Sequence, residues 1–169
     1  MNKHLKELTV ISLMAIVIAL ALNKFVCFLT YVPTASMEPT IKVKDRVLVR
    51  VVYDTSKLKR GDILTFYSKE EDSTLIKRLV GLPGDVIRIT DDKVSVNGEY
   101  LDNISLDIES EFHINKTYVV PEDCFFFLGD NRNDSFDSRF WENSYINKED
   151  ITGKALLRFS SLSDIEFFR

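Results

Sequence analysis

A serine between two prolines is the first feature of this sequence that suits catalytic chemistry. Ser36 lies in residues 33–40, PTASMEPT. Proline fixes φ and cannot donate to a strand ladder, so this segment should hold the hydroxyl rigidly outside a regular sheet. Such a hydroxyl suits a nucleophile, which also needs a base and donors for the developing oxyanion. The alternative is an ordinary proline-bounded turn whose Ser and Thr side chains satisfy local backbone groups.

The second feature is a lysine among apolar residues of an expected strand. In residues 74–80, TLIKRLV, strand alternation places Leu75, Lys77 and Leu79 on one face. Burial disfavours the ammonium form, and lowering a lysine pKa from about 10.4 to about 8 corresponds to about 3 kcal/mol. A neutral Lys77 can take the proton from Ser36, whereas Arg78 would stay protonated. The alternative is an edge-strand lysine that prevents aggregation.

Residues 129–139, GDNRNDSFDSR, are the third feature. Their density of Gly, Asn, Asp and Ser predicts a tight, hydrogen-bonded loop. Ser135 is a candidate to hold the Lys77 amine in place, and Asp137 can pair with Arg139 to brace the loop. A solvated turn with incidental charges is the alternative.

The sequence offers few other catalytic groups. His113 lies in a polar stretch without a neighbouring motif, so a Ser-His-Asp triad fits poorly, although His113 stays open as a base. Cys27 and Cys124 have no CxxC pattern or nearby histidine, which argues against a disulfide framework and a metal site. The net charge is −4 and no long run of Lys or Arg occurs, so nucleic-acid binding is not expected.

An apolar N-terminal segment is the first element that must position these residues. Residues 8–23 carry no charge. As a helix, residues 7–29 can cross a hydrocarbon core of roughly 30 Å if Lys24 snorkels toward the headgroups. The two lysines before this segment place the N-terminus in the cytoplasm. A cleaved secretory signal is the alternative, but Lys24, Phe25 and Phe28 stand where a small-residue cleavage site would be expected.

Short apolar runs divided by turn residues predict an all-β domain after the anchor. The expected strands are residues 46–52, 63–67, 74–80, 86–89, 93–96, 118–120 and 124–128. Asn97-Gly98 predicts a tight hairpin that returns through residues 99–101. A brief helical turn within 144–150 and an apolar run at 155–159 follow. The expected architecture is a mostly antiparallel β-barrel or sandwich behind one N-terminal transmembrane α-helix.

The chain length suits one domain of ordinary size with a short appendage. We expect a cytoplasmic tail at residues 1–6 and a transmembrane anchor at residues 7–29. Residues 30–169 should form an extracytoplasmic, β-rich catalytic domain with a small insertion near 97–117.

In this order, and behind an apolar segment, the three features resemble the conserved boxes of bacterial type I signal peptidases. These are Ser/Lys endopeptidases that remove secretory signal peptides. The resemblance covers the apolar segment and most of residues 33–141, including residues 45–49, DRVLV, which resemble a structural box. Ala35 stands where Gly or Pro is frequent, and Glu142 where Gly is usual. The short stretch at 101–116 indicates the compact form of the family.

The resemblance implies a role for each candidate residue. Ser36 would be the nucleophile and Lys77 the general base, while Ser135 orients the lysine. Thr34 would join the Ser36 amide as an oxyanion donor. The implied structural supports are Asp130, Asp137, Arg139 and Arg78.

The substrate implied by the resemblance is the signal peptide of a preprotein. An extended peptide would add as a strand beside residues 31–36 and 74–77. The expected pocket residues, which would admit alanine-sized groups at an A-x-A-like site, are Val32, Met37, Leu75 and Ile76. The lipid bilayer is a further partner, and the protein should work close to the secretion translocon. No cofactor is implied, because the amine serves as the base.

Two other functions stay open. One is a related Ser/Lys protease with another substrate, such as a self-cleaving regulator, although the membrane span fits it poorly. The other is a catalytically silent relative, a membrane-tethered β-domain that only binds extracellular partners. Such a relative would be expected to lack one residue of the Ser36–Lys77 pair.

Overall fold

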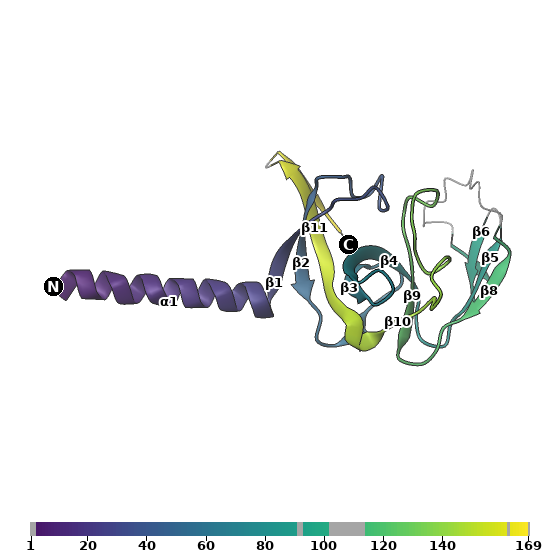
Figure 1. Cartoon of the computed structure of the whole chain (residues 1–169), viewed down its shortest axis with the longest axis horizontal. Coiled ribbons are helices and arrows are strands. Elements are labelled where there is room, and N and C mark those ends of the chain that lie inside the picture. The colour runs from purple at the N-terminus through teal and green to yellow at the C-terminus, as the bar shows by residue number, and fades with distance from the viewer. Residues whose placement is uncertain (1–2, 91–92, 102–113, 162, 169) are drawn as a thin grey trace.

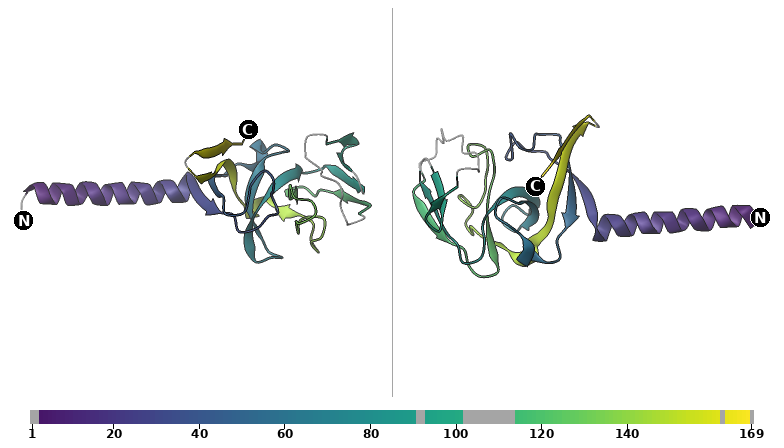
Figure 2. Two further views of the ribbon diagram at one scale, coloured as in Figure 1. Left: turned by 90° about the horizontal axis from the view of Figure 1, so that it is seen from above. Right: turned by 180° about the vertical axis from the view of Figure 1, so that it is seen from behind.

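A long helix and a β-rich domain make up the computed structural model, which describes residues 3–90, 93–101, 114–161 and 163–168 (Figure 1). Helix α1 (Lys3–Phe25) projects away from the strands in all three views (Figures 1 and 2). Large apolar side chains along it, such as those of Leu8, Ile11 and Leu20, are more than half exposed. Within the described part of the chain, no helix combines the length and the hydropathy that crossing a membrane requires.

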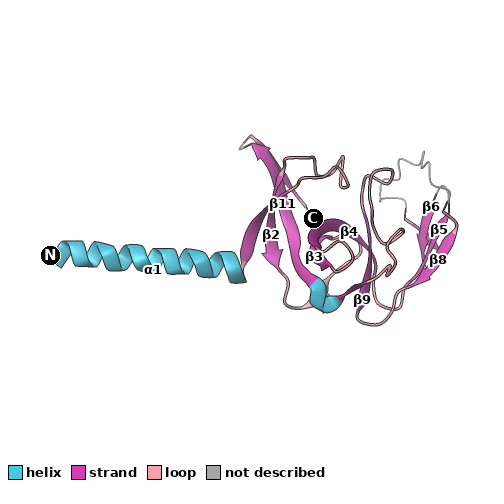
Figure 3. Ribbon diagram, viewed as in Figure 1, coloured by secondary structure: helices cyan, strands magenta, loops and turns pink. Residues whose placement is uncertain are grey.

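Strands make up most of the remaining secondary structure (Figure 3). In chain order they are β1 (Cys27–Tyr31), β2 (Arg46–Val51), β3 (Ile63–Ser68), β4 (Ser73–Gly81), β5 (Val86–Thr90), β6 (Lys93–Val96), β7 (Glu99–Tyr100), β8 (Lys116–Val119), β9 (Cys124–Leu128), β10 (Ile146–Asn147), β11 (Ile151–Ser161) and β12 (Asp164–Phe167). Two short 3-10 helices, η1 (Thr55–Lys57) and η2 (Lys148–Asp150), lie between strands.

The larger sheet has the order β1-β2-β11-β3-β4-β9-β10, and β12 pairs with β11. All of its pairs are antiparallel. Strand β4 pairs with β3 along its length, with Leu64 opposite Lys77. It pairs with β9 only from Arg78 onward, where Arg78 is opposite Leu128. Within the described residues, the first half of β4 therefore has a strand on one side only.

A smaller antiparallel sheet has the order β7-β6-β5-β8. The hairpin between β6 and β7 turns at Asn97 and Gly98, which have φ values of 54° and 88°. Positive φ at both positions is the requirement of a type I′ turn. The hairpin that this dipeptide predicted is therefore confirmed.

Among the described residues, three apolar clusters fill the domain. One joins the small sheet to β4 and β9 through residues that include Ile87, Val96 and Phe126. A second lies around Phe66 and Phe127, whose rings stack at 4.2 Å. The third lies under the β1–β2 connection. Every strand predicted from alternation is present, so the prediction of a mostly antiparallel β fold is confirmed.

The structure corrects the extent of the N-terminal helix. Residues 27–29, which were assigned to the anchor, belong to strand β1 instead, because Cys27–Tyr31 pairs residue by residue with β2. Phe28 also packs against an apolar cluster of the domain. Strand β12 was not predicted either. Residues 102–113, which contain most of the expected insertion and His113, lie outside the described residues.

Candidate active site

Ser36 lies in the connection between β1 and β2, and buried residues on both sides hold that connection in place. Val32 donates its N–H to the Asp45 carbonyl at 3.0 Å and accepts from Lys44 N at 2.9 Å, which closes the base of the loop. Met37 is fully buried in the cluster beneath it. Ser36 itself is only 7% exposed. The loop thus presents this hydroxyl from a fixed backbone.

Lys77 lies on β4 and is 4% exposed. Its neighbours on the same face, Leu75 and Leu79, belong to the Phe66 cluster, as the alternation predicted. Burial lowers the pKa of the Lys77 amine, and the negative charges of Asp137 and Glu71 oppose that shift only in part. Within the described residues, no carboxylate lies within ion-pair distance of the Lys77 amine. Its surroundings therefore favour the neutral amine.

Ser36 and Lys77 line one pocket of about 240 Å³, which we call the Ser36 pocket. Its other lining residues are Thr30, Tyr31, Pro33, Thr34, Thr65, Glu71, Ser73, Thr74, Leu75 and Ile76. The Thr34 hydroxyl lies 3.5 Å from Ser36 Oγ. The expected nucleophile, base and second hydroxyl are thus in one cavity.

The loop between β9 and β10 packs against the Ser36 loop from the other side. Asn131 donates its backbone N–H to the Ser36 carbonyl at 3.1 Å and its side-chain amide to the Ala35 carbonyl at 3.2 Å. A Cβ built on Gly129 would lie 2.5 Å from the Ser36 carbonyl oxygen and would also overlap Ser135. Only glycine permits this approach, which keeps the two loops in contact.

Asp137 organises the interior of that loop. Its carboxylate is fully buried and accepts from Ser135 Oγ at 2.8 Å and from Gly129 N at 2.9 Å. Arg139 pairs with it through Nε at 2.8 Å and Nη2 at 2.9 Å. A buried charge pair is tolerated when its remaining polar atoms are hydrogen-bonded, as they are here. Ser135 is thereby fixed beside Gly129.

A second charge pair ties β4 to the same loop. Arg78 donates from Nε and Nη2 to the Asp130 carboxylate, and from Nη1 to the Gly61 carbonyl at 2.8 Å. This two-point contact fixes the guanidinium in one plane. Because Arg78 follows Lys77 directly in the chain, this contact restrains the strand that carries the lysine.

The structure separates the four expected pocket residues into two groups. Leu75 and Ile76 line the Ser36 pocket. Val32 and Met37 lie in the apolar cluster beneath the Ser36 loop and are not among its lining residues. Both were expected to line pockets beside an added peptide strand, but the loop turns their side chains into the core.

Sequence reasoning missed three residues around the site. Asn131 hydrogen-bonds to the Ser36 loop, and Glu71 lines the Ser36 pocket. Both residues are far from Ser36 in the sequence. Arg132 is 5% exposed and donates from Nε to the Gly129 carbonyl at 2.8 Å. Burial lowers its pKa to about 10. The density of polar residues in 129–139 pointed to this loop but not to these partners.

Comparison with known proteins places the chain in a family. The model of the family described as signal peptidase, peptidase S26, matches residues 5–160. The signal peptidase I of Leptolyngbya laminosa is 36% identical over 155 residues, which cover 86% of this chain and 75% of that protein. A probable signal peptidase I-2 of Synechocystis is 34% identical, over 86% of this chain and 68% of that protein.

A relative of similar size extends the match to nearly the whole chain. The signal peptidase IB of Staphylococcus aureus MRSA252 is 30% identical over 185 aligned positions, which cover 99% of this chain and 95% of that protein. The matches include all three segments that form the Ser36 pocket and its bracing loop. This chain therefore belongs to the type I signal peptidases of peptidase family S26, serine endopeptidases that cleave signal peptides.

Proposed function

We propose that this protein is a membrane-anchored endopeptidase that removes signal peptides from preproteins, with Ser36 as nucleophile and Lys77 as general base. The observation that carries the proposal is the shared pocket, which both side chains line although each is less than a tenth exposed. A shielded lysine beside a serine is what a Ser/Lys mechanism needs, because only a neutral amine accepts a proton.

In this mechanism, the neutral Lys77 amine takes the proton of Ser36 Oγ as that oxygen attacks the scissile carbonyl carbon. The Ser36 backbone N–H and the Thr34 hydroxyl stabilise the resulting oxyanion, and the Thr34 hydroxyl is close enough to share one site with Ser36. The ammonium of Lys77 then protonates the leaving amine. A water molecule releases the acyl group from Ser36 through the same base.

Ser135 and the charge pairs act as supports in this proposal. Ser135 Oγ donates to Asp137, so its lone pairs stay available to accept a hydrogen bond from the Lys77 amine. Asp137 and Arg139 fix Ser135, while Asp130 and Arg78 fix the strand of Lys77. We propose that these four residues act on geometry rather than on the substrate.

The open half of β4 supports binding of an extended peptide. Residues 73–77 pair with β3 on one side, and within the described residues no strand pairs with them on the other. A peptide that adds there gains main-chain hydrogen bonds and runs past Ser36. Leu75 and Ile76 offer apolar contacts for small side chains before the cut. This arrangement suits an A-x-A-like site.

We also propose that α1 anchors the domain in the cell membrane as a single span. The support is its apolar surface, since large side chains such as Ile11, Leu13 and Leu20 are more than half exposed. Contiguous exposed apolar surface of this kind is unfavourable in water and suited to lipid. The lysines at its start favour a cytoplasmic N-terminus, which puts the Ser36 pocket on the outer side, near the translocon exit.

A cleavage assay with the purified full chain and a signal-peptide substrate tests the proposal. We expect Ser36→Ala and Lys77→Ala to lower kcat/KM by about a thousandfold or more, because residues that act as one catalytic unit are lost together. Ser160→Ala and Lys57→Ala are the controls, since both side chains are exposed and lie outside the Ser36 pocket. If Ser36→Ala and Lys77→Ala cut as fast as the parent, the assignment is wrong.

A further inference from the structure

The turn between β3 and β4 brings one carboxylate to the wall of the Ser36 pocket. Glu71 lines this pocket, and its backbone N–H donates to Ser68 Oγ at 3.2 Å. At the other end of the residue, the buried Trp141 donates from Nε1 to Glu71 Oε1 at 3.1 Å. Backbone and side chain are thus both held, so the carboxylate has a defined place in the wall.

The charges of the pocket lining make this carboxylate significant. Of the described residues that line the Ser36 pocket, Glu71 and Lys77 are the ionisable ones apart from the phenol of Tyr31. If Lys77 works as a neutral amine, Glu71 is the formal charge that a bound peptide meets there. Its charge also acts on Lys77. Burial lowers the pKa of Lys77, and Glu71 opposes this lowering, with an effect second in size to that of Asp137. Arg139 and Asp134 also act on Lys77, from the β9–β10 loop.

Glu71 retains capacity for a further partner. A carboxylate offers about four acceptor positions, and the Trp141 indole takes one of them. Among the described residues that line the pocket, none besides Lys77 has a basic side chain. A basic side chain of a bound peptide could therefore use this carboxylate, whereas an acidic side chain would be repelled by it.

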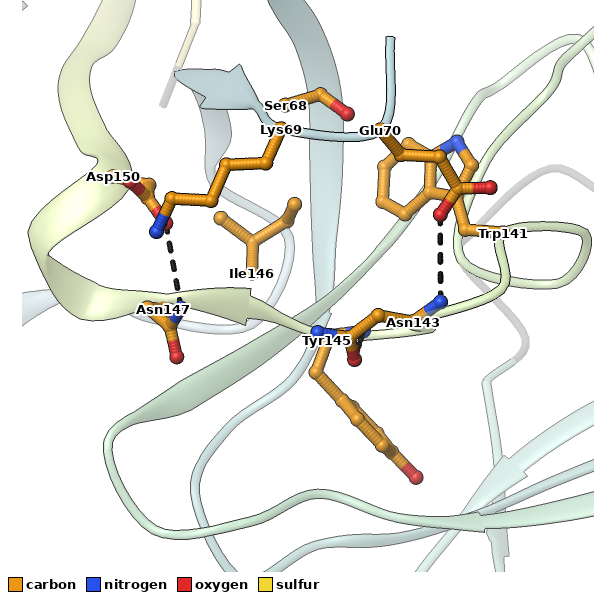
Figure 4. Close-up of a pocket in the computed structure, with 9 residues that line it drawn as sticks. All are labelled: Ser68, Lys69, Glu70, Trp141, Asn143, Tyr145, Ile146, Asn147 and Asp150. Carbon is orange, nitrogen blue, oxygen red and sulfur yellow. Dashed lines mark hydrogen bonds and ion pairs between the residues drawn. The ribbon is translucent and has the colours of Figure 1, made fainter. Parts of the chain in front are cut away.

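The neighbouring glutamate is different. Glu70 points toward Asn143 and accepts from its backbone N at 3.4 Å (Figure 4). It also accepts from Glu142 N at 2.9 Å. It lines a separate hollow of about 50 Å³ together with Lys69. The two glutamates carry the same charge in the same turn, but only Glu71 lines the Ser36 pocket.

We propose that Glu71 is a specificity-determining residue that favours a basic over an acidic side chain in the signal peptide, about four residues before the cut. The proposal rests on the proposed peptidase function. In a peptide that runs parallel to β4 with its scissile bond beside Lys77, the position follows from Ser73, which starts β4 four residues before Lys77. A peptide strand advances at the same rate, about 3.3 Å per residue, so its residue beside Ser73 lies near Glu71.

Matched peptides test the proposal with the full-length protein. They share one signal sequence and carry Lys, Gln or Glu at each of the positions three to six before the cut. We expect the parent to cleave the best-placed Lys peptide with a kcat/KM about fivefold above that of the Glu peptide, as for an exposed ion pair. Glu71→Gln should bring the ratio close to one, and Glu71→Lys should reverse it. Added salt should reduce the parent's preference.

The controls separate this inference from the peptidase assignment. Gln at position 71 keeps an oxygen for the Trp141 indole, so the fold should persist, and melting temperatures check this. Glu70→Gln removes the same charge outside the pocket and should keep the Lys preference. The inference is overturned if the parent cleaves the Lys, Gln and Glu peptides equally, or if Glu70→Gln abolishes the preference as fully as Glu71→Gln. Failure of the peptidase assignment would instead show as cleavage of every peptide by Ser36→Ala as fast as by the parent.

Discussion

Lys77 combines burial with proximity to acidic groups, and the balance between them sets its protonation. Desolvation lowers its pKa, and this effect outweighs the charges of Asp137 and Glu71. A general base is most effective when its pKa lies near the working pH. If Lys77 is the base, the burial of its side chain therefore has a kinetic consequence that can be measured.

The pH dependence of kcat/KM should report this residue. As the proposed general base, Lys77 must be neutral to accept a proton, so activity should rise with pH through the pKa of Lys77. That acid limb should lie below the value of about 10.4 for an ordinary lysine, because burial lowers the pKa of Lys77. A limb at the histidine value, lost on His113→Ala, would contradict the role of Lys77.

The same burial should cost stability. Since the folded pKa of Lys77 is lowered, the unfolded chain binds more protons, and stability rises with pH between the folded and the unfolded pKa. Lys77→Met should therefore raise the melting temperature at neutral pH by a few degrees, on the order of 1 kcal/mol. The gain should shrink as the pH approaches the unfolded pKa.

Lys154→Met is the matched control for this measurement. Lys154 pairs with the buried Asp62 at 2.5 Å, so its loss leaves a carboxylate without its partner. We expect it to lower the melting temperature, because an uncompensated buried charge is costly. Thermal unfolding of both variants, followed by circular dichroism, checks the contrast; a drop for Lys77→Met would contradict the argument.

Residue types revealed part of the site from the sequence. The prolines around Ser36 and the alternation around Lys77 are local signals, so both residues were named without coordinates. Asn131 and Glu71 have no such signal. The Asn131 side chain reaches the Ala35 carbonyl across 96 positions of the chain, and such a contact depends on how the loops pack.

Among the elements, the two loops that meet at Gly129 determine whether the Ser36 pocket forms. The Ser36 loop and the β9–β10 loop touch there with no room for a side chain. Asn131 then joins them through two hydrogen bonds. The geometry of the Ser36 pocket thus depends on a backbone contact as well as on the side chains that line it.

Gly129→Ala should separate these loops. The added methyl group would press on the Ser36 carbonyl and on Ser135, so we expect kcat/KM to fall by about a hundredfold, as for a misplacement of about 1 Å. Gly81→Ala is the control, because its Cβ would crowd Ile87, Val120 and Phe126 in the core away from the pocket. It should lower stability while the folded fraction keeps its kcat/KM. Equal activity losses in both variants would point to general unfolding instead.

Strand positions were predictable where apolar and polar residues alternate or where a turn signal follows, as at β4 and β6. Strand β1 was not, because Cys27-Phe28-Leu29 continues the apolar composition of the helix before it. Composition gives no contrast at that boundary. The change from helix to strand there coincides with the pairing of β1 with β2. That pairing is a tertiary contact, which local composition does not reveal.

At the scale of the whole molecule, the helix and the β domain are joined directly. Tyr53 donates its hydroxyl to the Phe25 carbonyl at 2.8 Å at the junction. The exposed apolar side chains of α1 take no part in the cores of the domain. The domain should therefore fold without the helix.

Deletion of residues 1–25 tests the separate roles of the two parts. We expect the shortened protein to stay folded, to cleave a soluble peptide within a few-fold of the parent's kcat/KM, and to lose cosedimentation with phospholipid vesicles, since its apolar helix is gone. Cosedimentation and peptide cleavage are measured on the same preparation. Vesicle binding equal to the parent's would show that the helix is not the anchor.

Strand β1 leads from the end of α1 to the Ser36 loop and is paired with β2 over all of its five residues. A paired strand hardly stretches, and at about 3.4 Å per residue this one spans about 17 Å. If α1 lies in the bilayer, the fixed length of β1 limits the distance between the lipid surface and Ser36. The choice of the bond that is cut in a preprotein would then depend on the distance of that bond from the membrane surface, as well as on the side chains near the bond.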